Sequence, residues 1–232
     1  MSREFELPKE IELPASPEEV WTAIATGPGA AAWFMPMEID PDDPQVVRWD
    51  PPRELAIRTP AAEDGTTQAF EYLVEARAGG ASVLRFVHSG VLGDDWSDEY
   101  EGMTSGGWDM YLFTLAQYLR HFRGAPATYA EAEAPAAGGW DRLRERLGSP
   151  QLGAPVEIDL PGGSRLSGEV DYLTGNFIGL RTADALIRFH ERSPLGMPIA
   201  VSDHHYGPDP LDRTEAWRHW LAESGSAPAE AG

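Results

Sequence analysis

The sequence contains no cysteine. Disulfide bonds, thiolate nucleophiles and cysteine-ligated zinc or iron–sulfur sites are therefore excluded. Basic residues are also scarce, because 18 Lys and Arg stand against 38 Asp and Glu and give a formal charge of −20. A protein this acidic repels nucleic-acid phosphates and anionic lipid headgroups, so we expect neither nucleic acid nor a membrane as a partner.

Long hydrophobic runs are missing as well. Nothing in the chain approaches the roughly 20 consecutive apolar residues that a membrane-spanning helix needs. Residues 1–9 alternate charged and apolar side chains and lack the basic-then-apolar order of a secretory signal. A cytoplasmic location is therefore the expectation.

The composition that remains is that of a folded protein. The chain has 232 residues, of which 42% are hydrophobic and 24% charged, enough for one large or two small domains. Residues 4–13 alternate Glu with apolar side chains, which predicts a half-buried strand. Ser16, Pro17 and Glu19 then carry the signature of a capping box with proline at the first helical position.

The first half continues as a series of strands and ends in a long helix. Strands are expected around Met37 and at 55–59, 68–76 and 81–91, with Gly79-Gly80 as a hairpin turn. Apolar residues then recur at spacings of four, three, four and three, which predicts a long amphipathic helix. They are Trp108, Leu112, Leu115, Leu119 and Phe122.

A change of composition divides the chain. Residues 125–139 are rich in Ala, Pro, Gly and Glu, which is typical of a linker. We therefore predict an α+β domain at 1–124, a linker at 125–139, a smaller α+β domain at 140–223 and a disordered tail at 224–232. The smaller domain should comprise a helix near Trp140, strands on both sides of Gly162-Gly163, three further strands and a final helix.

The first half resembles a known superfamily. Five segments occur in the order seen in the SRPBCC or START-like superfamily, and in particular in its subfamily of homologues of the activator of Hsp-90 ATPase, related to polyketide cyclases and birch-pollen allergens. They are Ile11 to Trp21, Ala32-Trp33-Phe34, His88-Ser89-Gly90, Asp94-Asp95-Trp96 and Gly106-Gly107-Trp108 through Leu119. The resemblance covers residues 1–124, and the second half matches no family that we can name.

The resemblance implies a helix-grip fold, in which a curved antiparallel sheet wraps around a long C-terminal helix and leaves an apolar cavity. Such a cavity would bind a small hydrophobic or amphipathic molecule without a cofactor and without a defined catalytic step. The residues expected around it are Trp33, Phe34, Phe70, Tyr72, Phe86, His88, Trp96, Trp108, Tyr111 and Leu112. Each of them also fits a role in core packing.

Two other functions stay open. A cyclase- or hydratase-like enzyme could use the same cavity, with His88 or Tyr72 moving protons, although no nucleophile or second base accompanies His88 in the sequence. A protein-interaction module of the chaperone-regulator kind is suggested by the subfamily alone. The oligomeric state is also open, and a homodimer is compatible with the sequence.

Metal binding is not expected. His190 and the run Asp203-His204-His205-Tyr206 contain suitable ligand types, but adjacent residues of a strand point to opposite faces, so His204 and His205 cannot share one ion without a bulge. Acidic residues at 94–101 precede the long helix and lack the ligand pattern of a calcium loop. Their position is explained by the positive end of the helix dipole.

Overall fold

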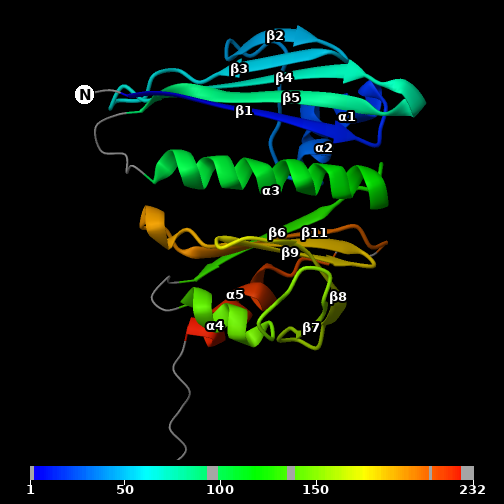
Figure 1. The fold of residues 1–232 in the computed structure, drawn as a ribbon, viewed down its shortest axis with the longest axis vertical. Helices are drawn as coiled ribbons and strands as arrows, with labels where there is room; N and C mark the ends of the chain where they lie inside the picture. Colours follow the sequence, from blue (N-terminus) through cyan, green and yellow to red (C-terminus); the bar gives the residue numbers. More distant parts are fainter. Residues whose placement is uncertain (1–2, 93–98, 135–138, 209–210, 226–232) are drawn as a thin grey trace, which may run out of the picture. The chain divides into compact units, whose positions relative to one another are not determined.

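A computed structural model describes residues 3–92, 99–134, 139–208 and 211–225 (Figure 1). The chain divides into two compact units, Met1–Pro126 and Ala127–Gly232. Each unit combines one antiparallel sheet with helices. The predicted α+β class is therefore confirmed. The tail predicted at 224–232 lies almost wholly outside the described residues.

The first unit has the order strand, two helices, four strands and a long helix (Figure 1). Its elements are β1 (Arg3–Leu13), α1 (Pro17–Ala25), α2 (Gly27–Ala31), β2 (Val46–Asp50), β3 (Glu54–Arg58), β4 (Thr67–Ala76), a 3-10 turn (Ala78–Gly80), β5 (Ser82–Leu92) and α3 (Tyr100–His121). The strands form one sheet in the order β1-β5-β4-β3-β2, and every pairing is antiparallel.

Strand β1 forms one edge of this sheet and follows the predicted alternation. Its glutamates are exposed, while Phe5 and Leu13 are buried. Pro8 stands opposite Val87 in the middle of the strand. Because proline has no N–H, it is tolerated only where that backbone position faces away from the neighbouring strand. At Pro8 the outer edge of β1 consequently offers no hydrogen-bond donor.

Helix α1 starts as the sequence predicts. The backbone N–H of Ser16 donates to the Glu19 carboxylate over 2.8 Å, and the Glu19 N–H donates back to the Ser16 hydroxyl over 3.3 Å. This reciprocal capping box satisfies two of the four N–H groups that a helix start leaves without partners. The helix ends at Ala25, and Thr26 caps the short α2 by accepting from the N–H of Gly29.

Helix α3 has 22 residues and runs along one face of the sheet, which we call the inner face (Figure 1). It begins eight residues before Trp108, where the predicted helix started. Lys9 of β1 fastens it to the sheet, because its ammonium lies 2.7 Å from the Ser105 hydroxyl and 2.7 Å from a carboxylate oxygen of Asp109. The spacing of apolar residues that predicted this helix begins only at Trp108, so it did not reveal the first two turns of α3.

The second unit consists of a six-stranded antiparallel sheet and two helices (Figure 1). Its elements are β6 (Thr128–Ala134), α4 (Gly139–Arg146), β7 (Pro155–Asp159), β8 (Arg165–Leu173), β9 (Phe177–Thr182), β10 (Ala185–His190), a 3-10 turn (Ser193–Leu195), β11 (Ile199–His205) and α5 (Thr214–Gly225). The strand order is β6-β11-β10-β9-β8-β7. Trp217 and Trp220 of α5 are buried against Phe189 of β10 and close the core.

Two predictions about elements are wrong. The segment 125–139, expected to be a linker, contains strand β6, which pairs with β11. Its inward residues are alanines, which are poor strand formers and hid the period of two. No strand forms around Met37, while β2, which was not expected, lies a few residues further along the chain.

Candidate functional site: an apolar pocket in the first unit

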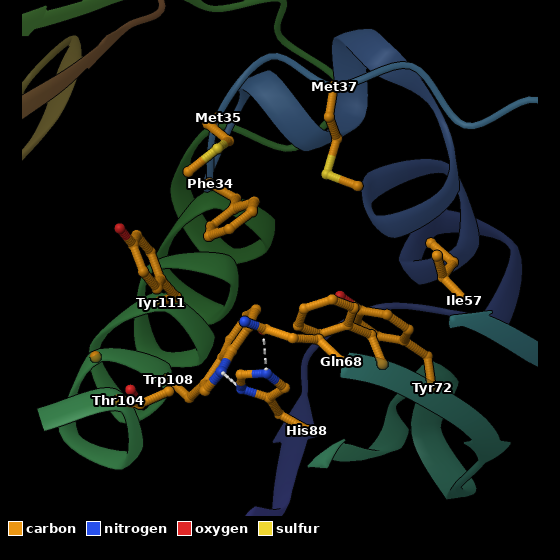
Figure 2. A pocket seen from close by; sticks show the side chains of 12 residues that line it. Phe34, Met35, Met37, Ile57, Gln68, Tyr72, His88, Thr104, Trp108 and Tyr111 are labelled. Atoms are coloured by element: carbon orange, nitrogen blue, oxygen red, sulfur yellow. Dashed lines mark hydrogen bonds between the residues drawn. The ribbon is translucent and has the colours of Figure 1, made fainter. Parts of the chain in front are cut away.

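A cavity of about 300 Å³ lies in the first unit, bounded by three parts of the chain (Figure 2). They are the inner face of the sheet, helix α3 and the segment that follows α2. The lining residues are Phe34, Met35, Met37, Ile57, Gln68, Phe70, Tyr72, His88, Thr104, Gly107, Trp108 and Tyr111. This volume falls at the lower end of the range of small-molecule sites, roughly 300–1,000 Å³.

The sheet supplies its part of the wall through cross-strand neighbours. Ile57 pairs with Phe70, and Phe70 pairs with His88, so these three side chains form one row across β3, β4 and β5. The Phe70 ring stacks on His88 with 4.5 Å between ring centroids. Tyr72 stands two residues beyond Phe70 and therefore shares its face.

Helix α3 supplies one stripe of its surface. Thr104, Gly107, Trp108 and Tyr111 follow the spacing i, i+3, i+4 and i+7, which places them on one side of a helix. A glycine inside a helix costs about 1 kcal/mol relative to alanine. Gly107 lies in the cavity wall and has no side chain to take up part of the cavity.

The segment after α2 forms the third wall. The Trp33 indole N–H donates to the carbonyl of Ala23 over 2.9 Å and fixes the chain on α1. The next residue, Phe34, stacks on Trp108 at 5.5 Å and meets the edge of Tyr111 at 4.7 Å. Met35 lines the cavity and is also 38% exposed, so the cavity reaches the protein surface at this residue.

His88 is held on both sides. The Trp108 indole N–H donates to its Nδ1 over 2.9 Å, and its Nε2 lies 2.8 Å from Oε1 of Gln68 (Figure 2). An indole nitrogen can only donate, so Nδ1 is the acceptor and Nε2 carries the proton that is donated to Gln68. Both ring nitrogens are thus occupied by protein groups.

Burial determines the protonation states of the ionisable side chains in and beside the pocket. It lowers the pKa of His88 to about 4, so the ring is neutral at pH 7. It raises the pKa of Tyr72, which therefore stays a phenol. Burial also raises the pKa of Tyr100, beside the pocket, against the opposite effect of its hydrogen bonds with Thr104 and Gln68. Among the described residues, none that lines the cavity is charged at pH 7.

No protein-family model matches the chain, and no curated protein matches its sequence. Several solved structures are similar to it in fold. Protein MLL2253 from Mesorhizobium loti is 17% identical, with a TM-score of 0.44 over 51% of this chain and 98% of its own. The Aha1 dimer from Colwellia psychrerythraea is 16% identical, with a TM-score of 0.41 over 52% of this chain and 99% of its own.

A third similar structure extends across both units. DynU16, a protein of the dynemicin biosynthetic locus, is 19% identical, with a TM-score of 0.41 over 95% of this chain and 96% of its own. At such identities and TM-scores, these likenesses are too distant to transfer a function to this chain.

Some of the predicted site residues line the cavity and others do not. Those in the cavity wall are Phe34, Phe70, Tyr72, His88, Trp108 and Tyr111. Phe86 is buried against Trp108 with 4.3 Å between their centroids, and Leu112 is buried in α3, but neither lines the cavity. Trp33 points to Ala23 instead, and Trp96 lies outside the described residues.

Six lining residues were not predicted. They are Met35, Met37, Ile57, Gln68, Thr104 and Gly107. The helical stripe could have been found by continuing the spacing backward from Trp108 to Thr104. For Met35 and Met37 the sequence holds no such signal, because they belong to a segment without a regular period.

None of the other predicted candidates that the structure describes lines the pocket. In the part of the chain that the structure describes, no group of three or more His, Asp or Glu side chains could hold a metal ion. On β11, His205 lies 3.3 Å from a carboxylate oxygen of Asp184, while the His204 ring packs against Tyr129. Asp94, Asp95 and Asp98 lie outside the described residues, and Glu101 pairs with Arg3. No described helix is both long and apolar enough to span a membrane.

Proposed function

We propose that the first unit is a helix-grip domain that binds a small, uncharged, hydrophobic or amphipathic molecule in this cavity. The observation that carries the proposal is the cavity itself, about 300 Å³ walled by aromatic rings and left unfilled by the side chains of the described residues. Protein interiors are normally packed to the density of organic crystals, with few voids larger than a water molecule. A pocket of this size, which opens to the surface at Met35, leaves apolar side chains without packing partners, and a bound ligand would supply them.

The energy available from such binding is moderate. A molecule as large as an aromatic side chain buries 150–250 Å² of apolar surface, which contributes roughly 4–6 kcal/mol at about 25 cal/mol per Å². Before the entropic cost of association is subtracted, that corresponds to dissociation constants from about a millimolar to tens of micromolar. A larger ligand with a well-placed hydrogen bond would bind more tightly.

Catalysis by His88 is disfavoured by its hydrogen bonds. A general base needs a free lone pair within reach of the substrate, and the one lone pair of neutral His88 accepts the Trp108 N–H. Its low pKa also makes it a weak base at neutral pH. We therefore propose that His88 holds the wall in shape, and that the cavity binds without the proton transfer that a cyclase or hydratase would require.

A ligand panel tests the proposal. One- and two-ring aromatic compounds and short-chain lipids should raise the Tm of the full chain in thermal-shift assays. Gly107→Leu should abolish these shifts by filling the cavity. Gly102→Leu is the matched control, since Gly102 lies on the same helix with open space around it.

Three outcomes would count against this function. A panel in which no compound raises the Tm of the wild type would contradict it, as would shifts that survive Gly107→Leu. Stoichiometric recovery of a chaperone in affinity purification, with no effect of any small molecule, would favour the protein-interaction module instead.

A further inference from the structure

Tyr72 brings to the cavity wall a hydroxyl group to which no described protein group bonds. Its side chain belongs to the cavity wall (Figure 2) and is 8% exposed. Its ring packs on Phe86 with 4.9 Å between the ring centroids. Within the described residues its hydroxyl has no hydrogen-bond partner, and burial is the sole cause of its raised pKa. Polar groups of a protein interior nearly always have a hydrogen-bond partner, so a hydroxyl without a protein partner in a cavity wall can be paired by a molecule in that cavity.

The neighbouring polar groups of the wall do not share this property. Both nitrogens of His88 are occupied, and Oε1 of Gln68 accepts from one of them. Thr104 bonds to Tyr100. These groups brace the wall, which leaves the Tyr72 hydroxyl available to orient a ligand.

The chemistry of the wall restricts the ligand. A charged group would lose its hydration in this wall, where no lining residue carries an opposite charge to pair with it. An anion would also be opposed by the protein's net charge of −20. The ligand is therefore uncharged.

The Tyr72 hydroxyl also selects the polar group that the ligand carries. A phenol donates more strongly than it accepts, because its oxygen lone pair is delocalised into the ring. The matching group on the ligand is thus an acceptor oxygen, as in a ketone or an ester.

The size of the cavity sets the size of the ligand. An apolar protein cavity of about 150 Å³ is enough to hold benzene. A cavity of about 300 Å³ therefore has room for two fused rings. Aromatic side chains from all three walls, Phe34, Phe70 and Trp108, offer faces and edges against which flat rings pack well.

We propose that the pocket selects uncharged, two-ring-sized apolar molecules that carry a carbonyl oxygen, and that Tyr72 is the specificity-determining residue that donates a hydrogen bond to this oxygen. The inference rests on the proposed binding function of the same cavity.

A pair of isosteric probes tests the inference. 2-Acetonaphthone carries the carbonyl, and 2-isopropenylnaphthalene replaces its C=O by C=CH2. Dissociation constants of both are measured by calorimetry on the full chain. Tyr72→Phe should weaken the ketone about five- to tenfold, the usual effect of one neutral hydrogen bond, and leave the alkene unchanged or tighter. Tyr129→Phe, the same change on β6 outside the pocket, should alter neither constant.

A spectroscopic measurement reports the bond directly. The infrared carbonyl band of bound, 13C-labelled 2-acetonaphthone should lie at lower frequency in the wild type than in Tyr72→Phe. Equal effects of Tyr72→Phe on both probes, or no difference in the carbonyl band, would overturn the role of Tyr72 while leaving ligand binding intact. If neither naphthalene binds although other panel compounds do, the ligand class is wrong. If no compound binds at all, the proposed function itself fails.

Discussion

The indole N–H of Trp108 donates to Nδ1 of His88 across 2.9 Å, and this bond ties helix α3 to strand β5 inside the pocket wall. It also fixes the histidine tautomer, and through it the orientation of the Gln68 amide. Side chains from two strands and one helix are thereby aligned before any ligand arrives.

Removing this donor should destabilise the first unit. Trp108→Phe keeps an aromatic ring but leaves Nδ1 of His88 buried without a partner, which costs about 1–3 kcal/mol. Urea denaturation followed by circular dichroism measures the free energy of unfolding. The control is Trp49→Phe, because Trp49 packs against Trp21 and its indole N–H has no such bond among the described residues. Equal losses in the two variants would show that ring volume, and not the hydrogen bond, is responsible.

The stability of the protein should depend on His88 in mildly acidic solution. The pKa of His88 is about 4 in the folded protein against an ordinary value of 6.5 for a histidine in the unfolded chain, so between these values the unfolded chain binds the extra proton. Stability contributed by this residue is therefore complete above pH 6.5 and declines as the pH falls towards 4, by about 3 kcal/mol at most.

His88→Gln isolates this contribution. Glutamine can accept from Trp108 but does not titrate, so the variant should lose less stability than the wild type between pH 6.5 and pH 4. The pKa of His190 is also lowered, to about 3, chiefly by burial, and its contribution remains in both proteins. Parallel pH profiles for the wild type and His88→Gln would contradict the assignment.

The second unit contains a buried ion pair whose loss should be costly. Arg213, before α5, lies 3.1 Å from a carboxylate oxygen of Asp203 on β11, and the same oxygen accepts the Trp217 indole N–H over 2.8 Å. Arg213→Met should lower the free energy of unfolding by about 3–5 kcal/mol, because it leaves a buried carboxylate without its counter-ion.

Two further variants sharpen that test. Arg218→Met, which removes an exposed partner of Glu215, should cost less than about 1 kcal/mol. Adding Asp203→Asn to Arg213→Met should restore part of the loss, since the amide still accepts from Trp217 without carrying a charge. Similar costs for Arg213→Met and Arg218→Met would refute the role of burial.

The sequence alone was sufficient for parts of the fold with a clear period. Alternation in β4 and β5 placed Phe70, Tyr72 and His88 on inward faces. The helical spacing placed Trp108 opposite them, with Tyr111 at the margin of the same stripe. Local rules also predicted the Ser16 capping box. In these cases the local sequence pattern and the tertiary packing favour the same conformation.

The rest depends on contacts between distant segments. Phe34 was identified, but its neighbours Met35 and Met37 lie in the wall only because the chain after α2 folds over the sheet. Gly107 contributes by having no side chain, which no hydrophobic pattern can reveal. Strand β6 is built on alanines and is defined by its partner β11 rather than by its own propensity.

Pro8, at the centre of edge strand β1, affects whether copies of the protein can associate through that edge at high concentration. A foreign strand that approached this border would find a missing donor at Pro8 and a row of carboxylates on either side of it. Such a border resists being extended by a neighbouring strand, so we expect β1 not to join copies of the protein strand to strand into fibres.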